Sequence, residues 1–140
     1  MKKFLFNANA TYFNFGLLFL RITVGASMIW FHGYGKISDP GRWKPLGENL
    51  DMIGINFLPE FWGFMAAFAE FFGAAFLILG LFTRISCLML VFTMFIAFYG
   101  GYIEKDMNSY PLNLMLVFIS IFIIGPGKFS LDAQINGFKK

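Results

Sequence analysis

The sequence predicts an all-α membrane protein, a bundle of four transmembrane helices with a long outer loop between the first and the second. Hydrophobic residues make up 58% of the 140-residue chain and charged residues only 14%, whereas soluble domains carry about 25% charged residues. The apolar residues are also gathered in four long runs. A chain of this length has room for a single domain, residues 1–140, with little left outside the bilayer.

The first three apolar runs are each long enough to cross a membrane. An α-helix rises about 1.5 Å per residue, so about 20 residues span a hydrocarbon core of about 30 Å. The fourth run is shorter, because Pro126 follows it between two glycines and stops the helix. We expect it to include Tyr110 or to lie where the bilayer is thin. The four runs are Phe13–Tyr34, Phe61–Phe82, Ile85–Ile103 and Pro111–Gly125.

The distribution of lysines and arginines predicts that both termini lie in the cytoplasm. With four spans, the N-terminal segment, the second connection and the C-terminal tail share one side of the membrane. Positive side chains are favoured on the cytoplasmic side. That side carries Lys2, Lys3, Arg84, Lys128, Lys139 and Lys140, and the other carries Lys36, Arg42, Lys44 and Lys105.

The connection over residues 35–60 is long for a helical bundle, and its apolar pattern predicts a short helix. Leu46, Leu50, Ile53 and Phe57 recur at helical spacing and share one face. We expect this helix to lie on the outer surface as a lid over the bundle. An irregular loop whose apolar residues touch lipid headgroups fits the same pattern equally well.

Two charged residues of opposite sign interrupt the first two spans. An ionised side chain at the bilayer centre costs several kcal/mol, so Arg21 and Glu70 need partners or a wet cavity. Counting helical rise from the inner edge places them at similar depths, which predicts an Arg21–Glu70 ion pair between the two helices. Such a pair either serves function or only fixes the helix register.

His32 is the only histidine of the chain, and the periodicity places it on the inward face of the first span. Arg21, Gly25, Met28 and His32 fall at intervals of 0, 4, 7 and 11 residues, close to three whole turns. Lys36 follows one turn further out. Both His32 and Lys36 are therefore candidates for binding a ligand or moving a proton in the outer half of the bundle.

Further residues extend this candidate site. Tyr99 and Asn113 are expected to reach the outer half, although such groups are often satisfied by backbone instead. Small residues surround Glu70 on its helical face, which predicts that this face is buried against another helix or subunit. These small residues are Gly63, Ala66, Ala67, Gly73 and Ala74.

Several function classes are excluded by composition. The net charge of +3 is scattered, without the basic patch that binds nucleic acid. Cys87 is the only cysteine, so a dithiol would have to come from a partner. One histidine and one intramembrane glutamate make an incomplete ligand set, so we predict no metal.

Three segments of the chain carry recognisable motifs. They are LLFLRITVGASMIWFHGYGKI with Arg21, Gly25, His32, Gly33 and Lys36, FAEFFGAAFLILGLFTRIS with Glu70, Gly73, Leu79, Gly80, Thr83 and Arg84, and IIGPGKFSLD with Gly125 to Asp132. In this order they resemble the DoxX family of small four-helix bacterial membrane proteins. The chain departs from the family at Ala74, where a second glycine often follows Gly73, and in the third span, which lacks a histidine that some members carry.

The resemblance implies a protein of the bacterial cytoplasmic (inner) membrane. Named members are associated with thiosulfate:quinone oxidoreductase and with membrane assemblies linked to thiol and oxidant stress, but a shared fold does not fix a function. We therefore expect a subunit of a quinone-linked redox assembly, in contact with lipid and with other envelope subunits or a second copy. A non-enzymatic scaffold and a bundle that binds a lipid or small amphiphile remain the alternatives.

Overall fold

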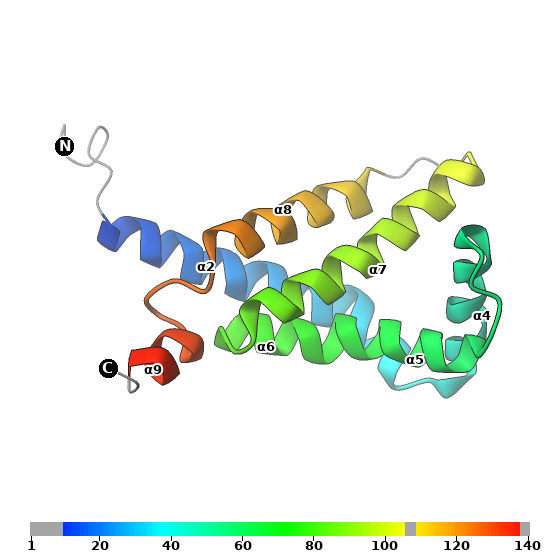
Figure 1. Ribbon diagram of the computed structural model, residues 1–140, viewed down its shortest axis with the longest axis horizontal. Coiled ribbons are helices and arrows are strands. Elements are labelled where there is room, and N and C mark those ends of the chain that lie inside the picture. The colour runs from blue at the N-terminus through cyan, green and yellow to red at the C-terminus, as the bar shows by residue number, and fades with distance from the viewer. Residues whose placement is uncertain (1–9, 106–108, 138–140) are drawn as a thin grey trace.

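The computed structural model describes residues 10–105 and 109–137, and every regular element within them is a helix (Figure 1). Three helical stretches are long and apolar enough to cross a membrane, which confirms an all-α protein with membrane-spanning character. A fourth apolar helix, α8 (Tyr110–Ile124), has 15 residues and falls short of that length. The three long stretches are Ala10–Ile37, Pro59–Leu79 and Thr83–Ile103.

Each of the first two long stretches contains one π-type turn. A π-type turn adds about one residue to the helix, so every side chain beyond it is rotated by about 100° from the position that an α-helix would give it. Such turns often occur at functional sites. The first stretch comprises α2 (Ala10–Met28), η1 (Ile29–Gly33) and α3 (Tyr34–Ile37), and the second comprises α5 (Pro59–Phe68), η4 (Ala69–Gly73) and α6 (Ala74–Leu79).

The connection between these two stretches is largely helical, so the predicted long loop takes the form of short helices. These are η2 (Pro40–Arg42), α4 (Trp43–Glu48) and η3 (Asn49–Ile53). In Figure 1, α4 stands at one end of the bundle, beside the beginning of α5. We call the segment from α4 to η3, residues 43–53, the lid.

The apolar face predicted for the lid is buried only in its first half. Leu50 is buried and Leu46 half-buried, but Ile53 and Phe57 are exposed. The reason is Gly54, which ends η3 with a φ of 83°, a left-handed conformation that glycine adopts without strain. The chain therefore leaves the helical path before Phe57.

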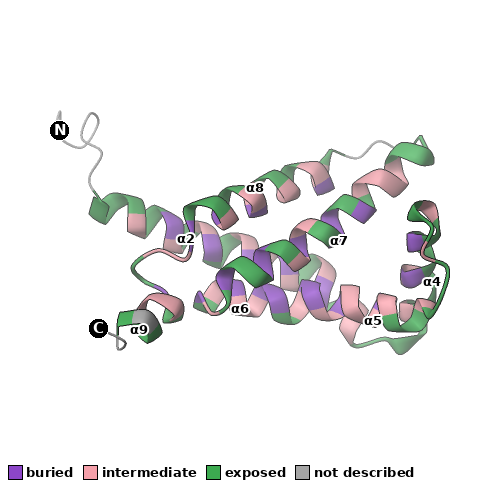
Figure 2. Ribbon diagram, in the orientation of Figure 1, coloured by how far each residue is buried: buried purple, intermediate pink, exposed green. Residues whose placement is uncertain are grey.

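The third long helix, α7 (Thr83–Ile103), packs along α8 in the bundle (Figure 1). Large apolar side chains cover the outer faces, as expected where the surrounding medium is hydrocarbon. Figure 2 shows the buried residues on the facing sides of the long helices. Fully buried members of the core include Met28, Leu77, Cys87, Leu90, Phe118 and Ile121.

The segment after α8 returns to the end of the bundle opposite the lid, where α9 (Leu131–Gly137) lies (Figure 1). Both carboxylate oxygens of Asp132 accept hydrogen bonds from backbone amides at the beginning of α7, those of Phe82 and Thr83, at 2.9 Å each. The Asp132 amide donates to the Gly80 carbonyl at 2.9 Å. Asp132 thus caps α7 and fixes the C-terminal segment to the α6–α7 turn.

Candidate functional site

Glu70 forms its ion pair with Lys36. The Lys36 Nζ lies 2.6 Å from Glu70 Oε2 and 2.7 Å from Oε1, so the ammonium group bridges both carboxylate oxygens. The Glu70 side chain is only 3% exposed and that of Lys36 23% exposed. The predicted pairing of Glu70 with Arg21 is wrong.

The register of the first two helices explains this correction. A Cβ added at Gly33 would lie 2.6 Å from the Glu70 carbonyl oxygen, whereas one added at Gly80 would overlap the Arg21 guanidinium. Gly33 lies 12 residues beyond Arg21 in the sequence, which corresponds to about 18 Å along a helix. That separation is too large for an arginine side chain. The π-type turn η1 then changes the direction in which Lys36 points.

Arg21 is buried at the opposite end of the bundle, where its two terminal nitrogens bond to backbone carbonyls. It is 1% exposed, and its Nη1 and Nη2 donate to the carbonyls of Pro126 at 2.6 Å and Phe129 at 2.5 Å. Both acceptors belong to the segment that follows α8. This arrangement gives Arg21 a structural role that is separate from the Lys36–Glu70 pair.

A cavity of about 180 Å³ lies between α5 and α7, next to the ion pair. Most of its wall is apolar, and the lid closes part of it through Leu46 and Leu50. Lys36 and Glu70 are the only charged residues among those that line it within the described part of the chain. From α5 and α7, the wall also includes Trp62, Met65, Thr93 and Ile96.

Trp62 and Thr93 add polar groups to this wall. The Trp62 indole N–H is buried and finds no acceptor within residues 10–105 and 109–137. The Thr93 hydroxyl donates to the Leu90 carbonyl at 3.0 Å, so its oxygen can still accept a hydrogen bond. Trp62 was not predicted as a site residue, because the sequence does not show which part of α5 adjoins the cavity.

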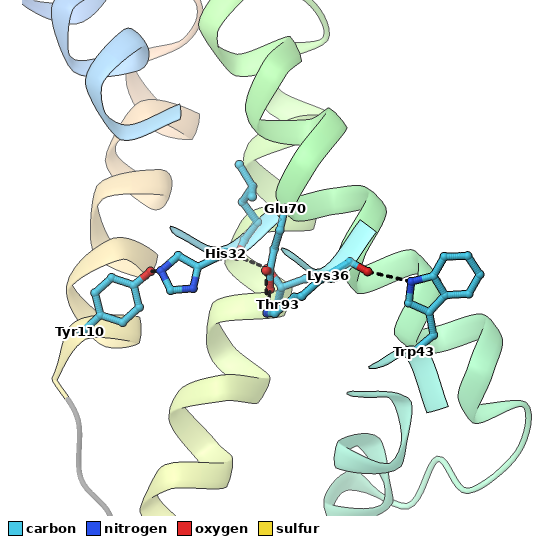
Figure 3. A network of polar contacts seen from close by, with 7 residues as sticks. His32, Lys36, Trp43, Glu70, Thr93 and Tyr110 are labelled. Atoms are coloured by element: carbon cyan, nitrogen blue, oxygen red, sulfur yellow. Dashed lines mark hydrogen bonds and ion pairs between the residues drawn. The ribbon is translucent and has the colours of Figure 1, made fainter. Parts of the chain in front are cut away.

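A third polar contact holds Lys36 from the side of the lid. The Trp43 Nε1 donates to the Lys36 backbone carbonyl at 3.0 Å (Figure 3). This bond satisfies a carbonyl at the end of α3 and ties the first residue of the lid to the turn that carries the ammonium group. The lid is therefore bonded directly to the residue that carries the ammonium group.

His32 lies beside the ion pair but is directed toward α8. Its Nε2 shares a hydrogen bond with the Tyr110 hydroxyl, and the two rings stack with centroids 4.9 Å apart (Figure 3). His32 is half-buried and is not among the residues that line the cavity. The structure thus joins Lys36 and Glu70 in one site and places His32 in a neighbouring pair.

The other two predicted site residues lie away from the cavity wall. Tyr99 stacks on Phe95, with centroids 6.0 Å apart and ring planes 10° apart. Asn113 is exposed on α8. Neither is brought to the Lys36–Glu70 pair.

The sequence of the chain matches a known protein family. The DoxX family model matches residues 16–102. The chain belongs to the DoxX family. The matched region of this DoxX protein includes Arg21, His32, Lys36 and Glu70, and it ends before the closing Gly125–Asp132 segment. No curated protein and no solved structure matched in the two other comparisons.

The side chains of this DoxX protein offer no ready-made metal centre in the part described. Within residues 10–105 and 109–137, no three His, Cys, Asp or Glu side chains are grouped so that they could hold a metal ion. Cys87 is a free thiol buried in the core. The polar groups that line the cavity are the ion pair and the side chains of Asn49, Trp62 and Thr93.

Proposed function

We propose that this DoxX protein is the membrane subunit of a quinone-linked redox assembly and binds the quinone ring in the cavity between α5 and α7. The observation that carries the proposal is a buried ion pair on the wall of a mostly apolar cavity of about 180 Å³. An apolar protein cavity of about 150 Å³ is sufficient to hold benzene. The volume therefore suits a single substituted ring.

The polar groups of the wall suit a neutral ligand with carbonyl oxygens. Lys36 and Glu70 neutralise each other, so the cavity has no net charge to attract an ion. Lys36 Nζ and Trp62 Nε1 are donors, and a quinone carbonyl is an acceptor. Phe92, also on the wall, is 44% exposed, which leaves room for an isoprenoid tail to reach the lipid.

The electron donor in this proposal is a dithiol of a partner protein, since Cys87 is the only cysteine of the chain. Oxidation of that dithiol to a disulfide releases two electrons and two protons, and the quinone takes up both to become a quinol. Lys36 is placed to stabilise the negative charge that develops on the ring oxygen, and Glu70 holds the ammonium group in position.

The proposal includes a topology in the bacterial inner membrane. The α8 helix crosses as a fourth span, and both termini lie in the cytoplasm. At about 1.5 Å per residue its 15 residues cover about 22 Å, which a locally thinner bilayer accommodates. The lysine and arginine distribution supports this orientation, and it places the lid on the outer side.

Quinone binding tests the proposal directly. A short-chain quinone is titrated into the protein in mild detergent, and the dissociation constant is measured by calorimetry. Lys36→Met removes a charged donor, so we expect affinity to fall by about tenfold or more. The matched control is Arg42→Ala, which breaks an exposed Arg42–Asp39 pair at 3.4 Å and should leave affinity unchanged.

The scaffold alternative predicts a different result. If the wild-type protein binds no quinone and Lys36→Met still assembles with its envelope partners, the ion pair serves only structure and the redox proposal is wrong. Binding of a saturated amphiphile in place of quinone would favour the lipid-binding alternative. Co-purification in mild detergent, with identification of bound chains and small molecules, separates these outcomes.

A further inference from the structure

A second cavity, of about 280 Å³, adjoins the first at the lid end of the bundle. We call it the vestibule. It shares three lining residues with the first cavity, Asn49, Ile96 and Ala97. The Asn49 amide from η3 and the Glu104 carboxylate at the end of α7 make its wall more polar than that of the first cavity. The rest of its wall comprises Gly100, Gly101, Glu104 and Pro111.

Glycines keep the vestibule open. A Cβ added at Gly100 would lie 3.2 Å from the Met52 methyl carbon of the lid, and any longer side chain there would enter the space between lid and α7. Glu104, on the wall of the vestibule, is exposed. The side-chain exposure then falls to 23% at Lys36 and 3% at Glu70, as expected along a passage that narrows inward.

In the described part of the chain, the opposite end of the bundle is closely packed. Leu77, Cys87 and Leu90 lie between the level of Glu70 and that of Arg21, and all three are fully buried. Beyond them, Arg21 and Ser130 are 1% and 2% exposed, and Arg21 donates to two carbonyls of the C-terminal segment. Among the described residues, this packed core and polar network separate Glu70 from the end that carries α9.

We propose that the vestibule and the first cavity form one passage through which water, and protons with it, reach the Lys36–Glu70 pair only from the lid end. The inference deepens the proposed function and rests on it for its redox meaning. The protons that the quinone site takes up or releases would exchange with the lid side of the membrane. The passage itself requires neither quinone nor a partner protein, so it can be tested on the chain alone.

Cysteine accessibility to Ag⁺ tests the passage without any quinone. In a Cys87→Ser background, Gly101→Cys reports on the vestibule and Ala66→Cys on the first cavity. Gln134→Cys, on the exposed surface of α9, marks the opposite side. Ag⁺ is added to right-side-out or inside-out vesicles, and the thiols left unmodified are counted with a maleimide after denaturation.

We expect Gly101→Cys and Ala66→Cys to react from the same side and Gln134→Cys from the other. Ala97 lines both cavities, so adding Ala97→Phe should abolish the reaction of Ala66→Cys and preserve that of Gly101→Cys. If Ala66→Cys is misfolded by circular dichroism, Met65→Cys takes its place on the same wall.

Reaction of the first-cavity cysteine from the Gln134 side, or no reaction in folded protein, would overturn the inference. Two further outcomes distinguish failure of the passage from failure of the proposed function. Labelling from the lid end without quinone binding rejects the quinone site and keeps the passage. Quinone binding with an unreactive first-cavity cysteine keeps the site and rejects the passage.

Discussion

Lys36 and Glu70 differ in how far each depends on the other. Glu70 is 3% exposed, so without the ammonium group its carboxylate would be left charged in an apolar wall or forced to take up a proton. Lys36 is 23% exposed, and its flexible side chain can turn toward the vestibule. Loss of Lys36 should therefore cost more stability than loss of Glu70.

Lys36→Met should destabilise the protein more than Glu70→Gln does. Removing one partner of a buried pair costs about 3–5 kcal/mol, and Lys36→Met leaves the more buried charge unpaired. Replacing both residues, Lys36→Met with Glu70→Leu, should recover most of the loss. Reversible unfolding in mixed micelles measures these free energies. Equal losses in both single variants, with no recovery in the double variant, would contradict the account.

The sequence identified the members of this pair but not the pairing. Glu70 was a candidate because charges are rare in membrane helices, and Lys36 because it follows His32 by one helical turn. The partner was wrong because apolar runs define where helices lie only to within several residues, and hydropathy contains no signal for a π-type turn. The Trp62 N–H, which has no acceptor among the described residues, could not be foreseen, since it depends on how α5 packs around the cavity.

The Trp62 N–H should recognise a carbonyl. Trp62→Phe keeps an aromatic ring on the cavity wall but removes the donor, so we expect quinone affinity to fall by about three- to tenfold. The control ligand is p-xylene, which has a similar ring without a hydrogen-bond acceptor. It should bind the wild-type protein and Trp62→Phe equally. The same loss for both ligands would mean that Trp62 acts only through packing.

At the scale of elements, the lid is held against α5 by two close backbone contacts. A Cβ on Gly47 would overlap the Pro59 carbonyl, and one on Gly63 would overlap the Trp43 carbonyl. Glycine allows the helices to approach this closely. Because Trp43 also bonds to the Lys36 carbonyl, the seating of the lid determines where the ammonium group lies.

Gly47→Ala and Gly63→Ala should each push the lid away from α5. Overpacking of this kind costs about 1–3 kcal/mol, and we expect a matching loss of unfolding free energy together with weaker quinone binding. The control is Gly16→Ala in α2, where an added Cβ meets nothing within 4 Å and helix propensity favours alanine. Unchanged binding in both lid variants would show that the lid does not position Lys36.

The elements were more predictable than their contacts. The apolar runs located the long helices to within a few residues, because about 20 apolar residues is a strong signal. The lid was predicted in its first half, where Leu46 and Leu50 face the cavity. Its second half was missed because a single glycine, Gly54, ends the helix.

At the scale of the whole molecule, the two ends have different roles. The lid end holds the cavity and the vestibule, and the other end is fastened by Arg21 and Asp132 to backbone groups. Sequence analysis found the closing segment as a motif, but its function as a fastening depends on contacts between residues more than 40 apart. No local pattern reports such contacts.

Asp132→Ala should lower stability without affecting the ligand site. The variant leaves the Phe82 and Thr83 amides without their acceptor, and loss of such a cap costs about 0.5–2 kcal/mol. Quinone affinity should stay at the wild-type value because the cavity is at the other end. Calorimetric titration and unfolding of the same preparation measure both. A fall in affinity would mean that the two ends are coupled.

The central claim is that the cavity beside Lys36–Glu70 binds the quinone ring, and photoaffinity labelling tests its location most directly. An azidoquinone is bound to the protein in vesicles, activated by light and mapped by mass spectrometry. The account predicts that label is confined to wall residues such as Met65 and Ile96 and is displaced by excess quinone. Label spread over outward-facing residues such as Phe19 and Leu116, without displacement, would contradict it.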